Sequence, residues 1–129
     1  MNDVLWTGRI PLAPVTKKNH QEIWIDRRTG KPFVAQSKQY RQYETDAMWY
    51  LQAPKSPISD MVNVKAIFYM PTRRRVDLIN LLQSVLDILV RSGVLLDDNS
   101  RIVYTIDGSR VDYDKDNPRT EIEITKIEL

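Results

Sequence analysis

The sequence contains no cysteine and a single histidine in 129 residues. Without cysteine the chain has neither a disulfide framework nor a thiolate metal site, and one histidine excludes a multi-histidine zinc centre. No apolar run approaches the roughly 18 residues that a membrane-spanning helix requires. The N-terminal residues also lack the basic and apolar regions of a signal peptide. We therefore expect a cytoplasmic protein with no membrane contact, built as one domain over residues 1–129.

Charge is distributed unevenly along the chain, although the net charge is only +2. Residues 1–75 carry 13 basic and 6 acidic side chains, a net charge of +7. Residues 76–129 carry 6 basic and 11 acidic side chains, a net charge of −5. A basic half suits a polyanionic partner and an acidic half suits a cation site. Uneven charge is equally compatible with two solvated surfaces, so the charge alone leaves both interpretations open.

Alternating apolar and polar residues predict the strands. The clearest example is the segment 61–70, and Thr29-Gly30 supplies the turn of a hairpin. The expected strands cover residues 5–11, the hairpin 22–35, and residues 61–70, 101–106 and 120–127, with a polar loop at 112–117.

Two helices are expected between these strands. Ser37 is a suitable N-cap for a helix that runs to about Gln52, and Asp77 is a suitable N-cap for a helix over residues 78–92 that Gly93 ends. The order of elements predicts an α+β (α/β) fold, with a mixed sheet of about five to six strands and two main helices.

The second expected helix is apolar around most of its circumference. Such a helix is buried on more than one side. One side is therefore expected to form a subunit interface, and the alternative is a central helix that the sheet and the first helix cover completely.

The residues that surround this helix point to a metal site. Asp77 begins the helix after three arginines, Asp87 lies in its middle, and Asp97 and Asp98 follow its end. If the chain returns antiparallel beside the helix, Asp97 or Asp98 approaches Asp77 or Asp87. Carboxylate oxygens suit Mg²⁺ or Mn²⁺, which activate water for phosphodiester cleavage. The alternative is that Asp77 serves only as an N-cap and Asp97-Asp98 only as a turn.

Basic residues define a second candidate surface. Arg73, Arg74 and Arg75 precede the helix and suit phosphate groups. Such contacts set affinity and register rather than base sequence, and the alternative is a solvated surface. The other residues expected to contact DNA or to extend this track are Lys17, Lys18, Asn19, Arg27, Arg28, Lys31, Lys38, Arg41, Asn80 and Gln83. Three tryptophans, Trp6, Trp24 and Trp49, are expected in the core rather than as base-stacking platforms.

The segment from Met70 to Val103 resembles the core of RusA-type Holliday junction resolvases, a family of endodeoxyribonucleases. The pattern consists of an arginine-rich strand end, an Asp-Leu-x-Asn helix start, a mid-helix aspartate, a glycine and an Asp-Asp pair. This chain has them as Arg73–Arg75, Asp77-Leu78-Ile79-Asn80, Asp87, Gly93 and Asp97-Asp98. The early Lys17-Lys18-Asn19 and the final strands fit as well.

The resemblance implies a homodimer with Mg²⁺-dependent sites that makes paired symmetric nicks in a four-way DNA junction during recombination and repair. It implies no small-molecule cofactor. Asp77 and Asp98 match catalytic carboxylates of the family, and Asp97 is the neighbouring acid. Metal ligands are therefore expected among Asp77, Asp87, Asp97 and Asp98.

Two positions depart from the pattern of some family members. Ile79 stands where those members have a further catalytic aspartate, and Gln83 stands where they have an essential lysine. Either Asp87, Asp97 or Gln83 completes the metal shell, or catalysis is weakened. The competing functions are a catalytically weak or silent junction-binding protein and a small DNA-binding regulator in which the acids only cap and turn.

Overall fold

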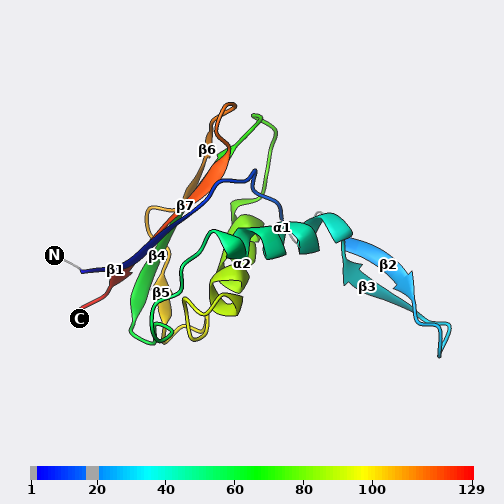
Figure 1. The fold of residues 1–129 in the computed structure, drawn as a ribbon, viewed down its shortest axis with the longest axis horizontal. Coiled ribbons are helices and arrows are strands. Elements are labelled where there is room, and N and C mark those ends of the chain that lie inside the picture. The colour runs from blue at the N-terminus through cyan, green and yellow to red at the C-terminus, as the bar shows by residue number, and fades with distance from the viewer. Residues whose placement is uncertain (1–2, 17–20) are drawn as a thin grey trace.

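The computed structural model describes residues 3–16 and 21–129, and within these ranges it contains seven strands and two helices (Figure 1). The elements are β1 (Val4–Ile10), β2 (Gln21–Ile25), β3 (Pro32–Gln36), α1 (Lys38–Trp49), β4 (Val62–Met70), α2 (Leu78–Arg91), β5 (Val103–Thr105), β6 (Arg110–Tyr113) and β7 (Arg119–Lys126).

Five strands form one mixed sheet. Strand β7 lies between β1 and β4 and is antiparallel to both, whereas β5 and β6 pair in parallel with the first and last parts of β4. Strands β2 and β3 form a separate two-stranded sheet. The predicted α+β class with two main helices is therefore confirmed.

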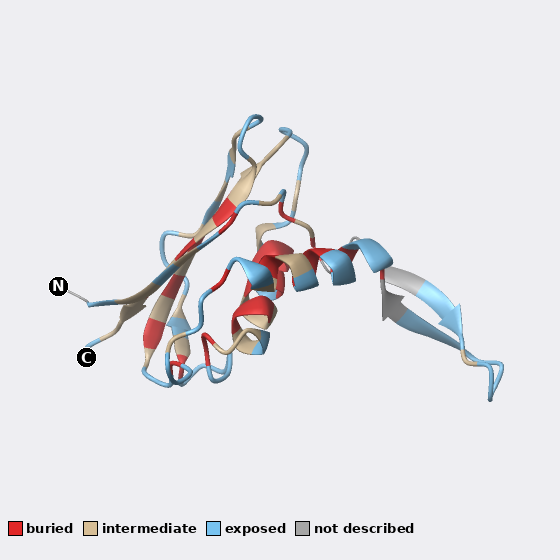
Figure 2. Cartoon of the chain, in the orientation of Figure 1, coloured by how far each residue is buried: buried red, intermediate tan, exposed pale blue. Residues whose placement is uncertain are grey.

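The core lies between one face of the large sheet and the two helices. Val62, Val64, Ala66 and Phe68 alternate along β4, and all four are buried. The same alternation in β7 buries Ile122 and Ile124. Figure 2 shows buried segments alternating with half-buried ones along the central strands of the sheet. The intervening side chains on the opposite face are half-buried, so one face of the sheet is covered and the other is open.

Helix α2 begins and ends where its sequence predicts. The Asp77 side chain caps its N-terminus, and Gly93, at φ +82°, follows its C-terminus in the left-handed region that glycine tolerates. Its sheet-facing side buries five apolar residues: Leu81, Leu82, Val85, Ile88 and Leu89.

A third side of α2 is left partly uncovered. Ile79 is 57% exposed, Gln83 is exposed, and Leu86 and Val90 are half-buried. These residues stand at i, i+4, i+7 and i+11 and therefore share one side of the helix. We call this set the α2 stripe.

The hairpin of β2 and β3 extends away from the rest of the molecule beyond the N-terminus of α1 (Figure 1). Its predicted turn is confirmed, because Gly30 adopts φ +70° and its N–H donates to the Asp26 carbonyl. Ser37 then caps α1 by accepting the Tyr40 N–H at 3.1 Å. We call the hairpin the arm.

Two expectations about this fold are wrong. Strand β6 occupies Arg110–Tyr113, although a loop is expected from residue 112. The strand forms because it pairs with β4, which is distant along the chain, and local periodicity does not report such pairing. Trp24 and Trp49 are 39% and 84% exposed rather than buried, whereas Trp6 packs against the core.

Within the described residues, neither helix has the length and apolar character needed to cross a bilayer.

Candidate active site

Asp77 lies at the exposed N-terminal end of α2. Its Oδ1 accepts the Ile79 backbone N–H at 2.9 Å, which satisfies one of the unpaired donors of the first turn. The positive end of the helix dipole also favours a carboxylate here. A carboxylate has two oxygens, so an N-cap bond through Oδ1 leaves Oδ2 able to bind a cation.

The arginine run forms the loop that leads into this helix end, and Arg73, Arg74 and Arg75 are all exposed. The Arg73 guanidinium lies 4.2 Å from the centre of the Tyr113 ring. None of the ion pairs formed within the described part of the chain involves these arginines. Beside them lies a hollow of about 240 Å³ lined by Thr72, Arg73, Arg74, Val111, Asp112 and Tyr113. The loop therefore offers cationic groups that form no ion pair with the described acidic residues, although Asp112 lines the same hollow.

Asp97 organises the loop beyond the other end of α2. Its Oδ1 accepts the Asp98 backbone N–H at 2.7 Å, and its Oδ2 accepts the Asn99 side-chain amide at 3.1 Å. The Asp98 N–H, followed by the Asn99 amide, lowers the pKa of Asp97 below its ordinary value. Asn99 Oδ1 in turn accepts the Arg101 N–H at 3.0 Å. Asp97 thus holds the loop, and Asp98 stands exposed on it.

Asp77 caps the N-terminal end of α2 (Leu78–Arg91), whereas Asp97 and Asp98 belong to the loop that follows its C-terminal end. Figure 1 shows this loop leaving the end of the helix opposite to the one that the arginine loop enters. A 14-residue helix is about 21 Å long at 1.5 Å per residue. Among the described residues no group of three acidic or histidine side chains is placed to hold a metal ion. Within the described part of one subunit, Asp77, Asp97 and Asp98 therefore do not form a three-acid metal group.

Asp87 faces α1 rather than either end of the helix. It lies near Tyr40. Burial is the main cause of the raised pKa of the Tyr40 hydroxyl, and the charge of Asp87 is a smaller one. The same side of α2 carries Arg91, whose Nη1 donates to Glu44 Oε1 at 2.7 Å. These groups join the two helices, and this position separates Asp87 from the other candidate ligands.

The remaining predicted contacts fall in different environments. Asn80 is only 9% exposed, because its side of the helix is packed inside the subunit, and a direct DNA contact by its side chain is not compatible with that burial. Gln83 is exposed on the α2 stripe. Lys17, Lys18 and Asn19 lie outside the described residues.

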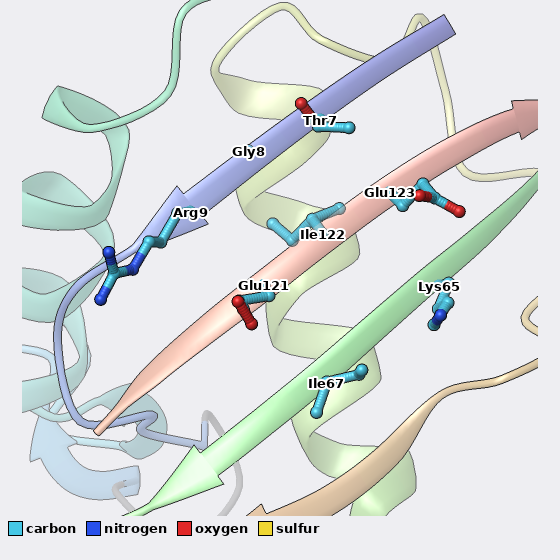
Figure 3. Close-up of a pocket in the computed structure, with 8 residues that line it drawn as sticks. All are labelled: Thr7, Gly8, Arg9, Lys65, Ile67, Glu121, Ile122 and Glu123. Carbon is cyan, nitrogen blue, oxygen red and sulfur yellow. The ribbon is translucent and has the colours of Figure 1, made fainter. Parts of the chain in front are cut away.

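A separate hollow of about 290 Å³ lies on the open face of the large sheet (Figure 3). Arg9 stands directly opposite Glu121, and Lys65 stands directly opposite Glu123. Opposite charges on neighbouring strands compensate each other. This surface therefore offers neither the concentrated positive charge that binds phosphate nor a set of acids for a metal.

Sequence reasoning did not identify Tyr113 or the Asp114–Arg119 pair. Asp114 donates its N–H to the Met70 carbonyl at 2.9 Å, next to the start of the arginine loop. Arg119 bonds the Asp114 carboxylate at 2.8 Å, which lowers the pKa of that acid, and lies 3.8 Å from the Tyr69 ring centre. No local pattern marks the contacts of Tyr113 with Arg73 and of Asp114 with Met70, because these partners are distant along the chain, whereas the Asp114–Arg119 pair spans only five residues.

Comparison with protein families gives one match that covers most of the chain. The family model described as Endodeoxyribonuclease RusA matches residues 11–125. This range includes both ends of α2 and all the candidate residues described above. A comparison with individually curated proteins finds no match.

Proposed function

This chain belongs to the RusA family of Holliday junction-resolving endodeoxyribonucleases, and on that premise we propose that two subunits together complete each of its catalytic sites. The observation that carries the proposal is the position of Asp77 and Asp98, exposed at opposite ends of one helix. Enzymes of this family act in recombination and repair.

A second subunit supplies a simple route to a complete site. In a symmetric dimer the same surface of each subunit meets at a two-fold axis. If the α2 stripes pair across that axis in antiparallel directions, the N-terminal end of one helix lies beside the C-terminal end of the other. Asp77 of one subunit then approaches Asp98 of the partner subunit, and this occurs twice.

The exposed residues of the α2 stripe support such a contact. Ile79, Leu86 and Val90 retain accessible apolar surface, and apolar side chains at the centre of an interface favour association. The sheet and α1 cover the other sides of α2, so the expected subunit interface is narrowed from the whole helix to this stripe.

The donor chemistry fits a hard divalent cation. Nucleases of this family typically depend on Mg²⁺, which prefers carboxylate oxygens and water. Asp77 and Asp98 of the partner subunit would hold the ion, while Asp97 keeps Asp98 in place through the loop. When bound, such a cation lowers the pKa of a coordinated water and stabilises charge on the phosphate oxygens.

Arg73, Arg74 and Arg75 would hold the DNA backbone beside this site. Guanidinium groups donate paired hydrogen bonds to phosphate oxygens. The Tyr113 ring supports Arg73 from the sheet side and restricts its position. The substrate we propose is a four-way junction, whose two equivalent strands match two symmetric sites.

Ile79 and Gln83 distinguish this chain from relatives with an aspartate and a lysine at these positions. Asp87 faces α1, so it is poorly placed to replace the missing acid. Gln83 is exposed on the α2 stripe, and its amide oxygen is the remaining neutral donor near the interface. We therefore expect a metal shell with fewer charges than in those relatives.

A mixing experiment tests the two-subunit site. Asp77→Asn and Asp98→Asn proteins should each fail to cleave a synthetic four-way junction in Mg²⁺. Subunits exchanged between the two should regain cleavage, because a mixed dimer contains one intact pair and one doubly altered pair. The regained product should be a single nick rather than paired nicks. Mixed dimers that stay inactive, although each homodimer binds the junction, would refute the shared site.

The main alternative is a catalytically weak junction-binding protein, which Ile79 and Gln83 favour. Unaltered protein incubated with the junction, with and without Mg²⁺, separates the two functions. Binding to the junction in preference to linear duplex, without nicking in either Mg²⁺ or Mn²⁺, would support the alternative.

A further inference from the structure

One face of the arm is aliphatic. Cross-strand pairs place Ile23 opposite Val34 and Ile25 opposite Pro32 on this face. Ile23, Ile25 and Val34 are between 65% and 76% exposed. An isolated two-stranded sheet is only marginally stable in water, and an exposed apolar patch marks an interaction site. This face is therefore suited to contact another molecule.

The other face of the arm is aromatic. Trp24 stands opposite Phe33, and their rings form an edge-to-face pair 6.2 Å apart. The Arg41 guanidinium of α1 lies 4.9 Å from the centre of the Trp24 ring. Both rings remain accessible, since Trp24 is 39% and Phe33 is 45% exposed. An aromatic ring with a guanidinium beside it has the chemistry to bind a base and its phosphate.

Positive charge is concentrated at the tip of the arm and at the start of α1. Residues 21–41 contain five basic and two acidic side chains, a net charge of +3. Arg27, Arg28 and Lys31 are exposed around the turn and form no ion pair with the acids that the structure describes. Asp26, the acid of the turn, accepts the Arg28 backbone N–H at 2.8 Å. This charge favours a polyanion over a protein as the partner of the arm.

The shape of the arm narrows the kind of polyanion. The arm projects from the rest of the molecule (Figure 1), and the five residues of β2 span about 17 Å at 3.3 Å per residue. Both broad faces are apolar, whereas the tip is cationic. Such an element fits between two apolar surfaces, with its tip in contact with phosphate groups beyond them.

Branched DNA offers these surfaces and a linear duplex does not. Inside a duplex each base pair is stacked on two neighbours, whereas a base pair beside an open branch point lacks one of them. Architectural DNA-binding proteins insert apolar side chains between base pairs while basic side chains contact the backbone. The two apolar faces and the cationic tip of the arm supply the same groups.

We propose that the arm is a wedge that enters the centre of a branched DNA. The Trp24–Phe33 face stacks on one base pair, and the aliphatic face lies against the base pair on the other side. Arg27, Arg28 and Lys31 contact phosphate groups. The inference rests on the junction substrate proposed above and assigns a separate role to the arm. The arm sets the preference for branched over linear DNA, whereas the arginine loop binds both.

Binding to a four-way junction and to a linear duplex, measured without metal, tests this role. Trp24→Ala should raise the dissociation constant for the junction by about tenfold and leave that for the duplex unchanged, because only the junction loses a stacking contact. Ile23→Thr combined with Ile25→Thr should raise it by about threefold, and threonine preserves the strand propensity of the arm. Trp49→Ala is the matched control, since Trp49 is 84% exposed at the other end of α1.

Crosslinking locates the arm on the DNA, because the chain has no cysteine of its own. Ile25→Cys carrying a thiol-attached photocrosslinker should link to nucleotides beside the branch point. Thr7→Cys, exposed on the open sheet face, is the control and should not link there. Crosslinks confined to positions distant from the branch point would overturn the wedge.

The binding measurements also have outcomes that contradict the proposal. Equal weakening for both DNAs would place the arm in a groove, and unchanged binding to both would identify the arm as a protein contact. Either result overturns the wedge. A protein that prefers the junction through its arm but makes no nick in Mg²⁺ would refute the proposed catalytic site and leave the wedge standing. Unaltered protein without any preference for the junction would overturn the wedge and the proposed substrate together.

Discussion

The two ends of α2 are chemically different although one helix connects them. At the N-terminal end a single carboxylate, Asp77, caps the helix beside three exposed arginines. At the other end Asp97 uses both oxygens in loop hydrogen bonds, and Asp98 remains exposed. One end combines an acid with exposed guanidinium groups, and the other presents an acid on a loop held by side-chain hydrogen bonds. Under the proposed two-subunit site, cleavage requires groups from both ends.

In the proposed site, this difference assigns metal binding to Asp77 and Asp98, DNA binding to the three arginines, and positioning of Asp98 to Asp97. Residues at both ends should be equally necessary for cleavage, whereas only the N-terminal end should control affinity for DNA. Variants at each end therefore have distinct expected effects.

The largest effect is expected from removing either exposed carboxylate. Asp77→Asn and Asp98→Asn should each lower the rate of junction cleavage by about a hundredfold or more, because the metal loses a charged ligand. Asparagine is as good an N-cap as aspartate, so Asp77→Asn should preserve α2. Circular dichroism and junction binding without metal provide the controls. Cleavage at the unaltered rate in both variants would exclude these acids as ligands.

The next largest expected effect is weaker DNA binding, and it concerns only the N-terminal end of α2. Replacing Arg73, Arg74 and Arg75 with alanine should weaken binding to every DNA. The slope of the logarithm of the binding constant against the logarithm of salt concentration should become shallower by about 0.9 for each phosphate group that is no longer neutralised. Binding isotherms at several salt concentrations measure this slope. Arg9→Ala with Lys65→Ala is the control, because acids oppose these residues across the sheet. An unchanged slope in the triple variant would identify the arginines as a solvated loop.

A smaller effect is expected from the acid that holds the loop. Asp97→Ala should reduce cleavage by about tenfold through misplacement of Asp98, because positioned groups lose efficiency when their support is removed. Asp97→Asn should recover part of the rate, since its carbonyl oxygen still accepts the Asp98 N–H. Binding to DNA should not change in either variant. Equal loss in both variants would favour a direct metal-binding role for Asp97.

The smallest effect is a pH dependence of the same loop. The pKa of Asp97 is lower in the folded protein than its ordinary value of 3.8. Its ionised form therefore contributes stability above pH 3.8, and the contribution disappears as the pH falls through the lowered pKa. Nuclear magnetic resonance should show the Asp98 amide signal shifting at that lower pH. A signal that moves only near or above pH 3.8 would contradict the hydrogen bonding described for Asp97.

Local signals in the sequence were sufficient for the elements that flank the site. Asp77 and Gly93 identify the ends of α2, and Thr29-Gly30 identifies the turn of the arm, because caps and turns depend on neighbouring residues. The α2 stripe is partly exposed, and the expected subunit interface there stays a prediction.

Features that depend on tertiary packing could not be predicted from local sequence signals. Helical periodicity places Asp87 and Asn80 on a polar side, but it cannot show that α1 covers that side. The spacing of Asp77 and Asp98 likewise allowed a close approach, whereas the chain turns at Gly93 and leaves the two acids at opposite helix ends. The exposure of Trp24 follows from an arm that projects from the molecule, which apolar content alone does not report.

If two subunits share each site as proposed, the separation of Asp77 from Asp98 along α2 determines how activity depends on protein concentration. With a site shared between subunits, a single chain is unable to cut, and the amount of active enzyme rises with the square of chain concentration when dimers are scarce. Under this proposal, dilute chains cut little DNA, and cleavage rises steeply once enough protein has accumulated to form dimers. The length of α2 would thereby make the reaction depend on protein concentration.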